Sequence, residues 1–360
     1  MSTKINTNFW KNKKVFVTGH TGFKGSWLCL LLHSLGAKVA GYALDPISKP
    51  NFFDDLRLKK YLVKDYRKNI KNFKLLKKAL TDFKPSIVFH LAAQSSVLVS
   101  YKNPLDTVST NVMGTTNLLE SIKNLKSVKS AVIVTTDKVY LNLEKQKKFK
   151  EDSKLGGFDL YSSSKAACDI ISESYLKSFF SKNNSGLAVV RSGNCIGGGD
   201  WTKDRIVKDC AESFSKNKNL LIRSPNATRP WQHVLDPLCG YIILANKLYF
   251  SKKFSGSWNF GPNKKNNLKV KEIVKIGKKI FKSNSKITYE KMKYYESEHL
   301  SLDSSKSFKL LKWKTRFFEK MALNLTFDWY KKFYEKKSIK TLISLSFNQI
   351  DKFKKKHNLT

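Results

Sequence analysis

The stretch K-V-F-V-T-G-H-T-G-F-K-G-S-W-L, which runs from Lys14 to Leu28, decides the fold that this sequence predicts. Its first five residues form a compact apolar run typical of a strand, and the apolar segment after it predicts a helix ending at Gly36. Between the two lie three evenly spaced glycines, Gly19, Gly22 and Gly25. Glycine permits a tight turn, close approach of the backbone to a pyrophosphate, and close packing of the helix on the sheet. The stretch therefore predicts the first unit of a dinucleotide-binding domain.

The next predicted strand, Lys38 to Ala43, supports this interpretation because it ends close to Asp45. In this type of domain an acidic residue about 20 positions beyond the last glycine binds a ribose hydroxyl, and an acid there favours NAD over NADP. Asp45 could instead be a turn former before Pro46, an alternative that leaves the spacing unexplained.

Strands and helices then alternate as expected of a parallel sheet with crossover helices. The predicted strands cover residues 61–64 (ending at Asp65), 86–90, 128–135 and 187–191, and the predicted helices cover 69–83 and 104–125. The pattern predicts an α/β fold, a Rossmann-type doubly wound parallel sheet in residues 1–190. A helix over 236–249 and a strand over 257–262 are expected to return to it. A smaller mixed α/β domain is expected from residues 191–233 and 263–360.

Two segments carry the candidate catalytic residues. V-T-T-D-K-V-Y follows a predicted buried strand and contains Thr136, Asp137 and Lys138, while D-L-Y-S-S-S-K places Tyr161 and Lys165 one helical turn apart. A nearby ammonium makes a phenol easier to ionise, so the Tyr/Lys pair is a plausible proton acceptor, with Asp137 as an acid. An isolated Y-x-x-x-K is more often a surface feature. Its place after a dinucleotide motif favours the catalytic interpretation.

Composition limits the other classes of function. The 360 residues include 68 Lys+Arg and 28 Asp+Glu, a formal charge of +40 that by itself suggests a nucleic acid or an acidic membrane as partner. The lysines are scattered and no nucleic-acid motif is present, so we expect neither partner. Five cysteines without a C-x-x-C pair predict reduced, mostly buried thiols and no metal site. With no signal-like or 18-residue apolar segment, a cytoplasmic protein is expected.

The second half offers a polar, glycine-rich loop from position 192 and then a cluster in I-R-S-P-N-A-T-R-P-W-Q-H. Its arginines could pair with phosphates and its aromatic residue could cover a base or a sugar, although such residues could equally cross-link loops. Helices are expected over 270–282 and 317–334. The lysine-rich tail from Lys331 has apolar residues at helical spacing and is expected to cover a protein surface; binding to a membrane surface is the alternative.

The order of five motifs resembles the extended short-chain dehydrogenase/reductase family of NAD(P)-dependent sugar-nucleotide enzymes. The motifs are G-x-x-G-x-x-G at Gly19, L-A-A-Q at Leu91, N-V-M-G-T at Asn111, T-T-D-K at Thr135 and Y-S-S-S-K at Tyr161. Longer segments such as R-S-G-N-C-I-G-G-G-D-W resemble the 4,6-dehydratases of that family, in the branch that acts on CDP-glucose. The resemblance implies NAD as cofactor, a nucleotide sugar as substrate, a homodimer or dimer of dimers packed through the helices near Pro104 and Tyr161, and a role in deoxysugar synthesis for lipopolysaccharide O-antigen.

The resemblance also assigns residues. The implied catalytic residues are Thr136, Asp137, Lys138, Tyr161 and Lys165. The implied cofactor-binding residues are Gly19, Thr21, Gly22, Phe23, Gly25, Asp45, Asp65, Leu91, Ala92, Ala93, Asn111, Tyr161 and Lys165. The implied substrate-binding residues are Gln94, Ser95, Asn194, Arg205, Arg223, Asn226, Arg229, His233 and His299. Lys138 stands where other dehydratase branches have a glutamate base, so it either removes the C5 proton or stabilises the enolate.

Several alternatives stay open at this point. Asn111 is either solvated in mid-helix or bends the helix and supports Lys165 through a water. Another sugar-nucleotide 4,6-dehydratase, a 4-epimerase, and an RNA-binding protein on a dehydrogenase scaffold are the competing functions. Ser192, where the family pattern has alanine, and the lysine-rich segment 141–150 depart from the pattern and are not expected to contact the motif residues.

Overall fold

A seven-stranded parallel sheet forms the centre of the computed structural model, which describes residues 6–143, 148–262, 268–290 and 300–356. Its strand order is β10-β6-β5-β4-β1-β2-β3, and every neighbouring pair is parallel. The strands are β1 (Lys14–Thr18), β2 (Lys38–Ala43), β3 (Lys64–Arg67), β4 (Ile87–His90), β5 (Ser130–Val134), β6 (Gly186–Ser192) and β10 (Gly256–Phe260). The predicted doubly wound fold is confirmed, and so is the return of the strand near residue 257 to the main sheet.

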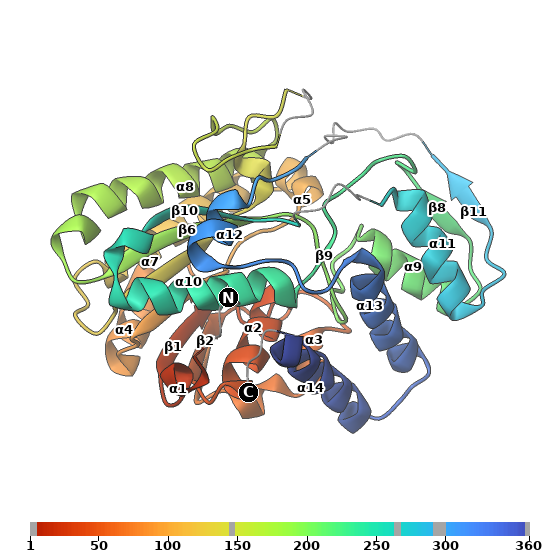
Figure 1. Cartoon of the computed structure of the whole chain (residues 1–360), viewed down its shortest axis with the longest axis horizontal. Coiled ribbons are helices and arrows are strands. Elements are labelled where there is room, and N and C mark those ends of the chain that lie inside the picture. The colour runs from red at the N-terminus through yellow and green to blue at the C-terminus, as the bar shows by residue number, and fades with distance from the viewer. Residues whose placement is uncertain (1–5, 144–147, 263–267, 291–299, 357–360) are drawn as a thin grey trace.

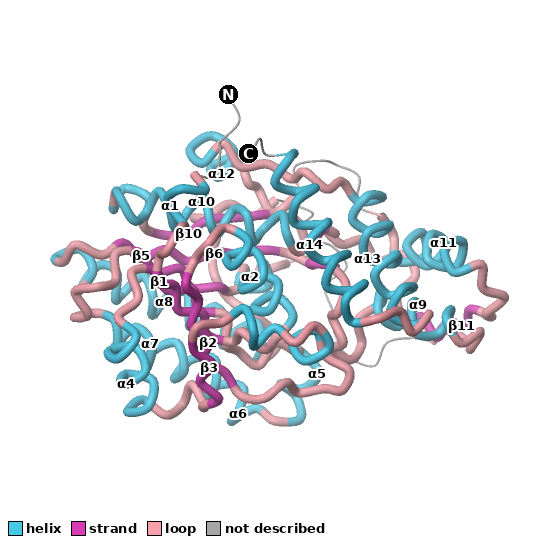
Figure 2. Tube along the Cα trace, turned by 90° about the horizontal axis from the view of Figure 1, so that it is seen from below, coloured by secondary structure: helices cyan, strands magenta, loops and turns pink. Residues whose placement is uncertain are grey.

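Helices cover both faces of this sheet, as Figures 1 and 2 show. One face carries α4 (Phe73–Phe83), α7 (Gly114–Ile122) and α8 (Leu160–Ser178), and the other carries α2 (Phe23–Ser34) and α10 (Leu235–Phe250). Side chains alternate along each strand, so that Val15 and Val17 enter one core while Phe16 enters the other. Both faces are therefore buried, which explains the continuous apolar strands.

Short elements complete this half of the chain. They are α1 (Thr7–Trp10), α3 (Phe52–Asp55), η1 (Leu58–Tyr61), α5 (Val97–Lys102), α6 (Pro104–Val108), the π-helical turn η2 (Ser109–Met113), η3 (Asp137–Val139), η4 (Phe180–Lys182) and η5 (Lys252–Phe254). Because the strand order reverses between β1 and β4, a crevice opens at the carboxyl ends of these strands.

Smaller sheets and four further helices complete the second half of the chain, and most of them lie on the right-hand side of Figure 1. The strands β7 (Cys195–Ile196) and β9 (Gln232–His233) pair, as do β8 (Leu220–Ile222) and β11 (Ile287–Tyr289). The helices are α9 (Ile206–Ser215), α11 (Val270–Phe281), α12 (Ser305–Leu311) and α13 (Glu319–Tyr334). The exact division into domains stays a prediction.

The C-terminal helix α14 (Ile339–Lys356) covers a surface, as predicted from its apolar spacing. It buries Leu342, Ile350 and Phe353, and its Lys354 Nζ donates to the Ser34 carbonyl at the end of α2, 3.0 Å away. Within the described ranges, no helix combines the length and apolarity needed to cross a bilayer.

Three sequence-based boundaries were wrong. The strand predicted at 61–64 starts only at Lys64, because Tyr61 ends the 3₁₀ helix η1, and Asp65 lies inside the strand instead of after it. The helix predicted from residue 69 starts at Phe73, because the Asn72 side chain accepts the Leu75 backbone N–H and caps it there. The helix predicted over 104–125 ends at Ile122 and contains the π-helical turn.

Candidate active site

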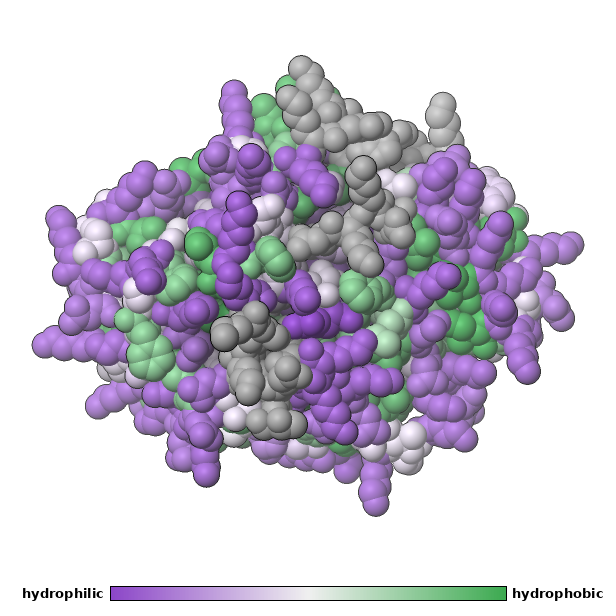
Figure 3. Space-filling view, viewed as in Figure 1, coloured by the Kyte–Doolittle hydropathy of each residue, from purple (hydrophilic) through white to green (hydrophobic). Residues whose placement is uncertain are grey.

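A cavity of about 1040 Å³ lies at the carboxyl ends of the sheet strands. Its walls come from the segments that follow β1, β2, β4, β5 and β6, facing α9 and β8 on the other side. Its volume is at the upper end of the range of about 300 to 1,000 Å³ that is typical of small-molecule and cofactor sites. On the outside of the molecule, hydrophilic side chains are spread over the face visible in Figure 3 and form no single stripe.

The glycine turn has the geometry that the sequence predicts. Gly19 has φ of +73°, and a Cβ there would lie 2.6 Å from the Ala92 backbone nitrogen. A Cβ on Gly25 would lie 2.1 Å from the Gly19 carbonyl oxygen, so the helix could not approach the turn. The N-cap of α2 is Gly22, which has no capping side chain, so backbone N–H groups of the first turn face the cavity. This end of the cavity fits an anionic diphosphate.

Asp137 is a buried acid in the same cavity. It is 2% exposed, and its Oδ1 accepts a hydrogen bond from Thr136 Oγ1 at 3.0 Å. Its Oδ2 has no hydrogen-bond partner among the described residues, and a Cβ on Gly193 would lie 2.9 Å from that oxygen. Burial raises the pKa of Asp137, although Lys138 and Thr136 oppose the shift. Asp137 can therefore carry a proton under conditions in which an exposed carboxyl would have lost it.

Tyr161 and Lys165 occupy the first two turns of α8 and line the cavity, as predicted. Burial raises the pKa of Tyr161, and a hydrogen bond with Thr136 and the charges of Lys24 and Arg205 oppose this increase. Burial also lowers the pKa of Lys165, whose Nζ donates to the Val134 carbonyl at 3.1 Å. The positive charges that lower the pKa of Tyr161 therefore come from Lys24 and Arg205, whereas the sequence had indicated Lys165.

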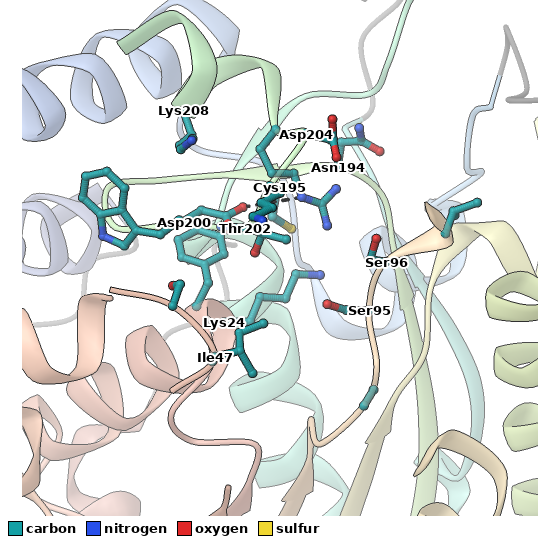
Figure 4. A pocket seen from close by; sticks show the side chains of 18 of the residues that line it. Lys24, Ile47, Ser95, Ser96, Asn194, Cys195, Asp200, Thr202, Asp204 and Lys208 are labelled. Carbon is teal, nitrogen blue, oxygen red and sulfur yellow. Dashed lines mark hydrogen bonds and ion pairs between the residues drawn. The ribbon is translucent and has the colours of Figure 1, made fainter. Parts of the chain in front are cut away.

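Lys24 is a site residue that the sequence reasoning missed. Figure 4 shows it extending from the start of α2 into the pocket toward Cys195. Its Nζ donates to Ser192 Oγ at 3.0 Å, and Ser192 also accepts a hydrogen bond from Tyr241 at 2.8 Å. Burial alone would lower the pKa of Lys24, but the neighbouring Cys195, Tyr241 and Tyr161 side chains raise it. The expectation that Ser192 contacts no motif residue was wrong, because Lys24 belongs to the glycine motif.

The predicted cofactor residues divide into two groups. All of them line the cavity except Asp65 and Asn111. Asp65 accepts hydrogen bonds from His20 and from Arg67, both at 2.8 Å. Burial by itself would raise the pKa of Asp65, but these two partners have the larger combined effect and lower it. Asp45 is largely exposed and pairs with Arg67 at 3.3 Å.

Asn111 supports the cavity wall from behind. It is fully buried in the π-helical turn, so the prediction of a solvated mid-helix residue was wrong. Its Oδ1 accepts from the Gln94 backbone N–H at 2.8 Å, and its Nδ2 donates to Ser164 Oγ at 2.9 Å. The other alternative, a bent helix that supports Lys165 through a water, stays a prediction, and the irregularity of the helix at this residue is the π-helical turn.

The predicted substrate residues are only partly brought together. Those that line the cavity are Ser95, Asn194, Arg205, Arg223 and Arg229. Gln94 instead donates to Thr107 Oγ1 at 2.8 Å, Asn226 is exposed outside the cavity, and His233 is buried between Trp27 and Phe317. His299 lies outside the described residues, as does the middle of the lysine-rich segment 141–150.

The nucleotide-binding sheet, the glycine turn and the buried Tyr161, Lys165, Thr136 and Asp137 define a class, the Rossmann-type enzymes that carry out redox chemistry on a bound substrate. The chain belongs to the GDP-mannose 4,6 dehydratase family, whose model matches residues 16–323.

Individual relatives are consistent with this family. The chain is 43% identical over 334 residues to CDP-glucose 4,6-dehydratase of Salmonella typhimurium, covering 91% of this chain and 93% of that protein. It is 27% identical to UDP-glucuronate 4-epimerase of Thermodesulfobacterium geofontis, covering 90% and 98% of the two chains.

Solved structures show the same fold. The crystal structure of dTDP-glucose 4,6-dehydratase from Bacillus anthracis in complex with NAD has a TM-score of 0.76 and 23% identity, covering 92% of this chain and 99% of that one. UDP-glucuronic acid 4-epimerase from Bacillus cereus, in complex with UDP-glucuronic acid and NAD, has a TM-score of 0.77 and 24% identity, covering 89% and 100%.

Proposed function

We propose that the protein converts CDP-glucose to CDP-4-keto-6-deoxyglucose and water, with NAD as a cofactor that stays bound through turnover. The observation that carries the proposal is the buried acid Asp137, whose second oxygen lacks a partner among the described residues and which shares a cavity with Tyr161. An epimerase requires no acid for a departing hydroxyl. The relative that is 43% identical over 91% of the chain supports CDP-glucose as the substrate.

The residues that would hold NAD fit that molecule. The glycine turn and the uncapped start of α2 suit the diphosphate, and Asp45 lies beside the carboxyl end of β2 where a ribose hydroxyl would bind. Ala92 and Ala93 leave space along the backbone after β4. When bound, NAD supplies the hydride acceptor for C4 of the sugar and then the hydride donor for C6.

Tyr161 and Thr136 would act on the 4-hydroxyl of the sugar. Tyr161 accepts the hydroxyl proton as the hydride leaves C4, and Thr136, which hydrogen-bonds Tyr161, holds the same hydroxyl. Lys24 and Arg205 favour the phenolate form of Tyr161 because each places a positive charge near the phenolic oxygen. The product of this half of the reaction is a 4-ketone, which acidifies the proton on C5.

Asp137 and Lys138 would complete the elimination. Lys138, which lines the cavity, removes the C5 proton, and Asp137 donates its proton to the departing 6-hydroxyl, so that one water is formed. Lys138 would then return the proton to C5 when hydride is added at C6. The raised pKa of Asp137 keeps that proton in place until it is needed. The side chains of Arg205, Arg223 and Arg229 line the same cavity and would bind the diphosphate of the substrate.

A substrate panel tests the proposal. Purified protein is incubated separately with CDP-, dTDP- and UDP-glucose and with GDP-mannose, and the products are identified by mass and by NMR. We expect rapid formation of a 4-keto-6-deoxy product from the CDP sugar alone. Its mass should be lower than that of the substrate by the mass of one water, about 18 units. A 4-epimer formed without loss of water would refute the proposal, and a preference for another nucleotide would refute its substrate.

We also propose a homodimer that acts in the cytoplasm in deoxysugar synthesis for cell-surface polysaccharide. Apolar side chains are exposed along α6, the π-helical turn and α8, namely Leu105, Val108, Met113, Leu160 and Ile170. Exposed apolar side chains on neighbouring helices support pairing with a second copy. Five free cysteines, four of them buried, support a reducing compartment.

A further inference from the structure

A buried ion pair behind the cavity connects the two catalytic segments. Asp169, on α8, accepts hydrogen bonds from Arg191 Nε at 2.8 Å and from Arg191 Nη2 at 2.7 Å. Both residues are about 2% exposed, and neither lines the cavity. The substrate therefore does not contact this pair, and the reaction as described above does not use it.

The pair holds both ends of the segment that carries Asp137. Thr135, two residues before Asp137, donates from Oγ1 to Asp169 Oδ2 at 3.1 Å. Tyr140, three residues after Asp137, accepts a hydrogen bond from Arg191 Nη1 at 2.7 Å. Between these two contacts lies the short 3₁₀ turn Asp137–Val139, which is also held by burial of Val139 and by the Gly156 N–H bond to the Val139 carbonyl at 2.8 Å.

The same pair also fixes the helix that carries the tyrosine. Asp169 lies one turn beyond Lys165 and two turns beyond Tyr161 on α8, and its charge acts on the Lys165 ammonium. Arg191 belongs to β6, so the pair sets the position of α8 on the sheet. A bidentate Arg–carboxylate contact has one preferred geometry, which makes it a more rigid connection than an apolar contact.

We propose that Asp169 and Arg191 are a positioning pair for catalysis, which sets the location of Asp137 and Lys138 relative to Tyr161 and Lys165. The two halves of the proposed reaction need these groups around one sugar, and an error of about 1 Å in such an arrangement can cost on the order of 100-fold in rate. This inference rests on the proposed function. It gives Asp169 and Arg191 a role in the reaction although neither residue contacts the substrate.

Mild variants test the inference without leaving a buried charge unpaired. Thr135→Val removes the hydroxyl that contacts Asp169 and, at 3.3 Å, the Val190 carbonyl. Tyr140→Phe removes the hydroxyl that accepts from Arg191 and donates to Asn259 at 2.7 Å. Neither substitution changes Asp169 or Arg191. The control is Tyr175→Phe, which removes a hydroxyl on α8 that donates to Glu120 at 3.0 Å and contacts neither Asp169 nor Arg191 among the described residues.

Steady-state kinetics with CDP-glucose give the first measurement. We expect kcat to fall about 10- to 100-fold in each of the two variants, KM to stay within about twofold, and the control to match the wild type. The near-ultraviolet absorbance of reduced nicotinamide should increase during turnover, because the acid is displaced relative to the tyrosine. If kcat stays within about threefold of wild type in both variants, or falls equally in the control, the inference is wrong, whatever happens to the melting temperature.

Hydrogen exchange gives a second measurement that needs no substrate. Amides in the peptide covering 135–140 should exchange faster in Thr135→Val and Tyr140→Phe and at the wild-type rate in Tyr175→Phe. Unchanged exchange in the two variants would overturn the inference. Wild-type protein that shows no dehydration of CDP-glucose would instead contradict the proposed function, and the exchange measurement would still decide the positioning role.

Discussion

Replacing Asp137 with asparagine separates the two halves of the proposed reaction. The side chains have the same shape, the site is 2% exposed, and the Thr136 hydroxyl that donates to Oδ1 can still donate to the amide oxygen. What is lost is the proton that Oδ2 would donate. Removing a general acid typically costs about 100- to 10,000-fold in rate, or about 2.7 to 5.5 kcal/mol in activation free energy. Tyr161 is unchanged, so the oxidation at C4 should continue.

Two measurements on Asp137→Asn test this reasoning. Mixing the variant with CDP-glucose should produce the absorbance of reduced nicotinamide at a rate near that of the wild type, while the 4-keto-6-deoxy product should appear at least about 100-fold more slowly. Because burial raises the pKa of Asp137, the folded protein loses stability as the pH rises through that pKa. The neutral amide removes this loss, so the melting temperature at pH 8 should be equal or higher. An unchanged overall rate would refute the role of Asp137 as the acid.

Three further predictions follow from single residues. Lys24→Met removes a charge that lowers the pKa of Tyr161, so the pH profile of C4 oxidation, measured by reduced-nicotinamide absorbance, should shift to higher pH; an unshifted profile would contradict this. Burial raises the pKa of Asp236 from 3.8 to about 8, so its contribution to stability is present below pH 4 and is lost between pH 4 and pH 8, at most on the order of 5 kcal/mol. In denaturant unfolding, the free energy of unfolding of Asp236→Asn should therefore fall less between pH 4 and pH 8 than that of the wild type. Leu105→Arg places a charge among these exposed apolar side chains of α6 and α8 and should give monomers in sedimentation experiments, whereas an unchanged mass would place the dimer contact elsewhere.

Residues whose role depends on local rules were predictable from the sequence. The glycine turn needs glycine because of a positive φ and a close backbone contact, and both follow from the type of turn. Tyr161 and Lys165 face one cavity because residues four apart lie on one face of a helix. The alternation of apolar strands and amphipathic helices likewise predicted the parallel sheet and the return of its last strand.

Residues whose role depends on distant partners were not predictable. Lys24 looks like one more lysine in a chain that has 68 Lys+Arg, and only folding brings it to Ser192, which is 168 positions away. His233 is close in sequence to Arg229, but its ring packs between Trp27 and Phe317, so its buried position reflects packing. Asp65 stays a predicted cofactor residue, and the sequence did not indicate that its carboxylate also accepts from His20 and Arg67.

The π-helical turn at Asn111 makes this helix one residue longer than regular α-helical pairing would require. A π-helical turn contains one residue more than the α-helix around it, so it resembles an insertion that the helix has absorbed. Deleting Val112 would restore regular α-helical pairing and leave the flanking turns on their present faces, with Leu118 still in the core. The Asn111 contacts to Gln94 and Ser164 would be lost. A one-codon deletion here should therefore yield a folded protein with a disturbed cavity wall, so the extra residue serves the cavity and not the packing of the helix.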